Sequence, residues 1–135
     1  MRNPKLDRLV LQLENYSECW KQFNRYLNQA RLKRFDPEDE TQFLEVKTVL
    51  TQELEMIMAA VDCTSPARED VLGLIGNAPS LRYLSELSEG NLRGMENQWH
   101  KIYIAWQSLL GQLKVQQRQL DSRSRLSTLF SREKA

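Results

Sequence analysis

An apolar residue recurs at every third or fourth position through most of the first 30 residues of this chain. A second series of the same kind runs through its last third. Alternating steps of three and four are typical of a helix that packs against other helices along its whole length. The first series is Leu6, Leu9, Leu13, Tyr16, Trp20, Phe23, Leu27 and Ala30; the second is Leu92, Met95, Trp99, Ile102, Trp106, Leu109 and Leu113, ending at Leu120 after Gln116. The two series predict an all-α fold.

Length and composition are those of a single globular domain. The chain has 135 residues, of which 41% are hydrophobic and 27% are charged, so it can bury a core and does not resemble a disordered chain. Every apolar run is shorter than the roughly 18 residues that a membrane-spanning helix needs. The N-terminus lacks the apolar core of a secretory signal, so we expect a cytoplasmic protein.

Proline and glycine positions divide the chain into helices, because proline is tolerated at the first position of a helix. We expect one helix from Pro4 to about Lys33 and a second from Pro37 to about Val61, folded back antiparallel by a short turn. Prolines and glycines within residues 63–90 predict two short helices, 66–75 and 79–88. A last long helix is expected over about 91–122, and the alternative is one kinked helix over 80–122.

The architecture predicted from these elements is an antiparallel bundle of three long helices, up-down-up, with one or two short helices capping one end. Residues 1–122 would form its single domain. Residues 123–135 are rich in serine and arginine, and we expect them to form a basic, flexible tail.

Charge is distributed unevenly along the chain. Residues 1–35 carry eight Lys/Arg and three Asp/Glu, whereas residues 36–62 carry eight acidic residues and Lys47 alone; residues 114–135 are basic again. In an antiparallel bundle the acidic second helix would lie beside both basic segments. We therefore expect opposite charges to help determine which helices pair.

Residues that could carry chemistry are few and scattered. Cys19 and Cys63 have neither disulfide nor metal-ligand spacing, and we expect two reduced thiols. His100 is the only histidine, which is too few for a zinc or bundle-type di-iron site. A histidine-phosphotransfer domain is an alternative, although Tyr103 and Ile104 occupy positions where such domains carry lysine and small residues. We expect no enzymatic activity, no metal and no cofactor, and the sequence indicates no small-molecule substrate.

Aromatic residues of the second series suggest a protein–protein boundary, because Trp and Tyr combine a large apolar area with a polar group. Tyr103, Ile104 and Leu110 lie beside the packing line of the last long helix, which makes that helix apolar over more than one narrow face. In the tail, Leu126, Leu129 and Phe130 have the spacing of one helix face. We predict the following partner-binding residues: Trp99, Tyr103, Trp106, Leu110, Leu126, Leu129 and Phe130.

The function predicted from these features is a protein-interaction module, a structural, assembly or adaptor subunit that binds another protein or a second copy of itself by helix packing. In length, and in its helical hairpin followed by a longer C-terminal helix, the chain resembles the small all-helical export chaperones, such as the flagellar ones. This resemblance implies an export chaperone as the alternative function and transfers no functional residue. Binding to nucleic acid or a membrane is not expected, since the pI is about 7.8 and the basic tail has Phe130 as its only aromatic residue.

Overall fold

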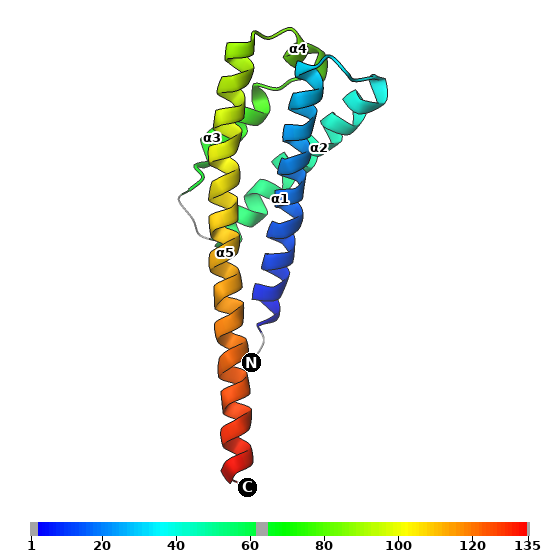
Figure 1. The fold of residues 1–135 in the computed structure, drawn as a ribbon. Coiled ribbons are helices and arrows are strands. Elements are labelled where there is room, and N and C mark those ends of the chain that lie inside the picture. The colour runs from blue at the N-terminus through cyan, green and yellow to red at the C-terminus, as the bar shows by residue number, and fades with distance from the viewer. Residues whose placement is uncertain (1–2, 62–64, 135) are drawn as a thin grey trace.

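The computed structural model describes residues 3–61 and 65–134, with side chains through Arg123 and that of Leu126. This part of the chain is all-helical and contains no strand, so the predicted fold class is confirmed (Figure 1). Five helices pack together: α1 (Pro4–Arg31), α2 (Pro37–Val61), α3 (Arg68–Gly76), α4 (Leu81–Ser85) and α5 (Glu89–Lys134). None of the helices in the described ranges combines the length and the hydropathy needed to cross a bilayer.

The long helices begin where the sequence signals predict. The Asn3 side chain accepts hydrogen bonds from the first backbone N–H groups of α1, and Pro4 occupies the first helical position. At the start of α2, the Asp39 N–H donates to the Asp36 carboxylate at 2.8 Å, and the Asp36 N–H donates back to the Asp39 carboxylate at 3.1 Å. This reciprocal pair satisfies backbone donors that have no partner within the helix.

α1 is the central helix, and it contacts α2, α4 and α5. The Tyr16 hydroxyl donates a hydrogen bond to the carbonyl oxygen of Leu50 at 2.6 Å, and the Tyr26 hydroxyl donates to the side-chain oxygen of Gln42 at 2.9 Å. Later residues of α1 thus meet earlier residues of α2. The first two helices therefore form the antiparallel hairpin that their short connection requires.

α5 is also antiparallel to α1, which corrects the predicted up-down-up order. Gln117, late in α5, donates a hydrogen bond to Asp7 near the start of α1 at 2.8 Å. Glu89, the first residue of α5, pairs with Arg31, the last residue of α1, at 3.2 Å. α2 and α5 therefore point in the same direction (Figure 1). The reason is the path of residues 65–88, which carries the chain back along the body before α5 begins.

The two short helices do not cap one end together, as the sequence suggested. α3 contacts α2 and α5, and it lies alongside the long helices (Figure 1). Only α4 lies at an end of the body, where α1 finishes and α2 starts. There the Glu40 carboxylate accepts hydrogen bonds from the backbone N–H groups of Leu81 at 3.1 Å and Arg82 at 2.8 Å. An acid of α2 thus satisfies the free donors at the N-terminus of α4.

Aromatic side chains of α1 form the centre of the core. The ring of Tyr16 meets that of Trp106 edge-on at 5.4 Å, and the ring of Phe23 lies 5.6 Å from that of Phe43. Both predicted apolar series are largely buried, with Leu9, Trp99, Leu109 and Leu120 partly exposed at their edges. Each of these large side chains buries much apolar area, which stabilises the fold.

Ion pairs connect α1 with α5, not with the acidic α2 as the charge distribution suggested. Arg31 pairs with Glu89 and Glu96, and Lys114 pairs with Glu14 at 3.2 Å. Among the described residues, no ion pair joins α1 to α2. The buried α1–α2 contact is instead apolar and hydrogen-bonded, and the acids of α2 are exposed or partly exposed at its edges.

Replacing Tyr16 with phenylalanine is expected to reduce the alkaline sensitivity of the fold. Burial raises the pKa of Tyr16 above its ordinary value of about 10. Above about pH 10 the unfolded tyrosine ionises while the buried one keeps its proton, so stability falls as pH rises. Tyr16→Phe removes this alkaline loss of stability. It also removes the hydrogen bond to Leu50, which lowers the free energy of unfolding at neutral pH by about 1 kcal/mol. Urea unfolding at about pH 8 and pH 11 measures both effects. If the original chain and Tyr16→Phe lost equal amounts of unfolding free energy between these two pH values, the buried Tyr16 hydroxyl would not be the source of the alkaline sensitivity.

Candidate interaction surface

Two of the predicted partner-binding residues lie inside the core. Trp106 is fully buried, and Leu110 is 6% exposed. α1 covers the face of α5 on which both lie, since Trp106 packs against Tyr16. The structure therefore places these two residues in the packing of the chain itself and not on an uncovered strip.

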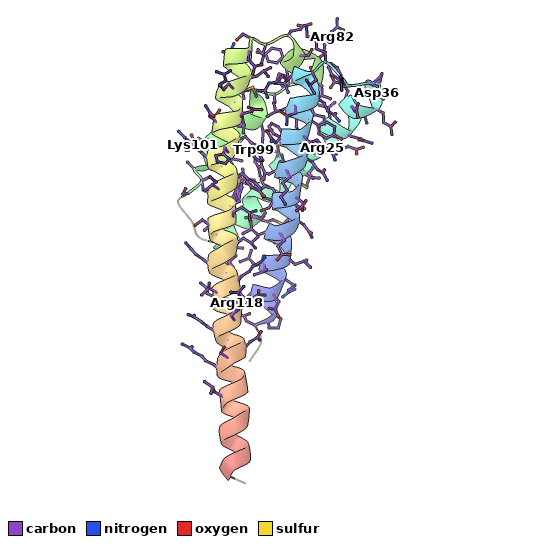
Figure 2. All side chains as sticks on the ribbon, viewed as in Figure 1. Arg25, Asp36, Arg82, Trp99, Lys101 and Arg118 are labelled. Carbon is purple, nitrogen blue, oxygen red and sulfur yellow. The ribbon has the colours of Figure 1, made fainter. Side chains whose placement is uncertain are left out.

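Trp99 and Tyr103 lie half-buried at the edge of the α1–α5 contact. Their rings stack with centroids 4.8 Å apart and an interplanar angle of 9°. The Trp99 indole N–H donates a hydrogen bond to the backbone carbonyl of Trp20 in α1 at 2.8 Å. Figure 2 shows Trp99 on the side of α5 that faces α1, with Lys101 pointing away. The polar group of Trp99 is thus already used within the chain, to hold α5 against α1.

The tail residues belong to α5. The helix continues without a break to Lys134, so the domain boundary expected at residue 122 falls inside one helix. The physical reason is that residues 112–134 contain neither glycine nor proline, and helical hydrogen bonding continues through them. Leu126 is 53% exposed, whereas the side chains of Leu129 and Phe130 lie outside the described residues.

α5 extends well beyond the helix it packs on. Its 46 residues span about 69 Å, compared with about 42 Å for the 28 residues of α1. The Gln117 contact with Asp7 places the start of α1 level with about residue 120. Residues 122–134 therefore project past the bundle, and no described element lies alongside them (Figure 1). We call this segment the overhang.

The face of α5 opposite the core carries a stripe of exposed residues without charge. Its three large members, Ile104, Val115 and Leu126, are each about half exposed, at 52%, 49% and 53%. They are 11 residues apart, which is close to three turns of an α-helix, so they lie on one side of it. The stripe, which we call the outward stripe, consists of Ile104, Ser108, Gly111, Val115, Gln119, Ser122 and Leu126.

The outward stripe is about 33 Å long and runs from the middle of the bundle onto the overhang. The other exposed large apolar side chains of the described residues are spread over different parts of the chain: Leu11, Leu32, Leu44, Met56 and Tyr83. Of the stripe's residues, sequence reasoning predicted only Leu126 as partner-binding; it placed Ile104 beside the packing line, noted Gly111 as a small residue that allows close helix approach, and missed Val115. The signal that could have identified Val115 is its spacing of 11 residues from both Ile104 and Leu126, on the side of α5 opposite the core series.

The chemically reactive side chains form no cluster in the described residues. His100 is exposed on α5, with its ring beside that of Trp99. Burial raises the pKa of the Cys19 thiol, and the negative charges of Glu53 and Glu18 raise it further, which disfavours the reactive thiolate. Cys63 lies outside the described residues. No group of three His, Cys, Asp or Glu that could hold a metal ion occurs where the structure is described.

The function of the outward stripe has to be inferred from its own residues, because no similar protein indicates one. Comparison with known proteins finds no matching family model, no matching curated protein and no matching solved structure.

Proposed function

We propose that this chain is a non-enzymatic protein-interaction module that binds a partner helix along the outward stripe. The observation that carries the proposal is the row of half-exposed apolar side chains, Ile104, Val115 and Leu126, on the face opposite the core. Aligned apolar anchors on an exposed helix face are the usual way in which one helix recognises another. Singly exposed apolar residues are common on protein surfaces, but these three lie in one line on an uncharged face, about 16 Å from one to the next, so one straight helix can contact all of them.

Gly111 is a second, independent observation that favours this proposal. A Cβ atom placed at Gly111 would meet nothing within 4 Å, so packing inside the chain does not require glycine there. Glycine in a helix interior costs about 1 kcal/mol relative to alanine. Close approach of a second helix backbone would explain a glycine at this point of the stripe, with Ser108 and Ser122 as further small residues on it.

The overhang also favours a partner. Most of the stability of a helix in a protein comes from packing of its apolar face, and residues 122–134 have no described neighbour. A helix bound along the outward stripe would supply that packing. In an assembly or adaptor subunit the bound helix would belong to a structural partner, whereas in an export chaperone it would belong to the exported protein.

A photo-reactive amino acid tests this function directly. Placed at Val115 in the native cell, it is expected to form covalent adducts at defined positions on a partner helix, identified by mass spectrometry. The matched control is the same amino acid at Leu11, which is 59% exposed on α1 and lies outside the stripe. Val115→Glu should abolish the association, and Leu11→Glu should preserve it, because only the former places a charge in the contact. Absence of adducts at Val115, or equal adducts at both positions, would contradict the proposal.

A further inference from the structure

We infer that the partner helix is α5 of a second copy of this chain, packed antiparallel with the two Val115 residues facing each other. This inference rests on the proposed function and specifies its partner. It follows from the order of residues along the outward stripe, the position of the overhang, and the charges beside the stripe.

The outward stripe has nearly the same character when followed in either direction from Val115. An antiparallel pair centred there sets Ile104 level with Leu126, so that apolar side chains meet at both ends as well as at the centre. Ser108 is level with Ser122, and Gly111 is level with Gln119, so no pair brings two bulky side chains together between the anchors. A surface that is complementary to itself in this way forms a closed two-fold interface.

The same register covers both overhangs. It brings residues 122–134 of each copy level with residues 96–108 of the other, which lie in the packed part of α5. The end of α5, Lys134, then falls level with Glu96, within the length of the partner helix. Neither copy keeps an unpartnered end, which accounts for a helix that is longer than the bundle requires.

Charges beside the stripe favour the antiparallel over the parallel arrangement. In an antiparallel pair the same flanks of the two stripes meet, so Arg118 lies beside Gly111 of the other copy and Arg123 lies beside Ala105, both without charge. In a parallel pair in register, opposite flanks meet, so Arg118 of one copy would lie beside Arg123 of the other, five positions further along. Like charges placed together across an interface disfavour that arrangement.

Cysteine cross-linking in a Cys19→Ala, Cys63→Ser background tests this geometry. Val115→Cys alone is expected to give a cross-linked dimer, because the two-fold axis brings the two thiols together. Ile104→Cys and Leu126→Cys should each fail to cross-link alone but should cross-link with each other when mixed. Cross-linking of all three single variants would show a parallel pair and overturn the inference.

Light scattering provides the second test and separates this inference from the function proposed above. The purified chain should have twice its monomer mass of 15.9 kDa. Val115→Glu should weaken self-association by about 100-fold or more, while Leu11→Glu leaves it unchanged. A monomeric chain whose Val115 probe links to a different protein in cells would overturn the second-copy inference and retain the proposed function. A monomeric chain without any adduct would overturn both.

Discussion

Replacing Trp106 with alanine is expected to lower the free energy of unfolding by about 3–5 kcal/mol. The Trp106 side chain is fully buried between α5 and α1, and its ring packs edge-on against that of Tyr16. Truncation removes a large apolar contact between the two helices and leaves a cavity that the surrounding rings cannot fill. Urea unfolding followed by far-ultraviolet circular dichroism measures the loss.

The matched control for Trp106 is Ile104, which lies two residues earlier on the opposite side of α5 and is 52% exposed. In the Val115→Glu background, which is intended to keep the chain monomeric, Ile104→Ala should change the stability by less than about 1 kcal/mol. Similar losses for the two variants would show that Trp106 does not lie in the core. A fully stable Trp106→Ala protein that no longer binds its partner would instead make Trp106 a surface contact residue.

Substitutions at Gly111 are expected to have opposite effects, depending on the residue introduced. Gly111→Pro should destabilise the chain by about 3 kcal/mol or more, because proline removes a helical hydrogen bond and clashes with the preceding turn. Gly111→Ala should stabilise the monomer by up to about 1 kcal/mol, since alanine is the better helix former and its Cβ meets nothing within 4 Å. Both are measured by urea unfolding in the Val115→Glu background.

Gly94 is the control that separates the effect of Gly111 on helix stability from its effect on self-association. It too lies inside α5 with open space around it, but outside the outward stripe. Gly94→Ala should therefore give a similar gain in stability without changing self-association, whereas a large side chain at Gly111 should weaken self-association. Little effect of Gly111→Pro would mean that α5 is already interrupted there.

The helices and their inward faces could be predicted from the sequence because the signals for them are local. Asn3 with Pro4, and Asp36 with Pro37, mark helix starts by satisfying or omitting free backbone donors, and α2 has the predicted bounds. The steps of three and four in the apolar series identify the side of each helix that is buried. The end of α5 was misplaced because composition alone suggested a flexible tail, although nothing between Gly111 and Lys134 interrupts a helix.

The candidate surface depended on contacts that no local pattern contains. Trp106 and Ile104 are both apolar and are two residues apart, yet one is fully buried and the other half exposed. Periodicity places them on opposite faces of α5, but only the packing of α1 shows which face is covered. Val115 became recognisable as part of a row once the covered face was known.

Sequence by itself determined that the chain is all-helical, where its long helices begin, and which of their faces are apolar, because capping and helical periodicity involve residues within a few positions of each other. Tertiary structure alone decided that α5 lies antiparallel to α1 and projects beyond it. That outcome depends on where residues 65–88 bring the chain back, and on contacts such as Trp99 with Trp20 between residues far apart in sequence. The free energy of such contacts is set by how whole helices fit together, which a pattern along one helix does not specify.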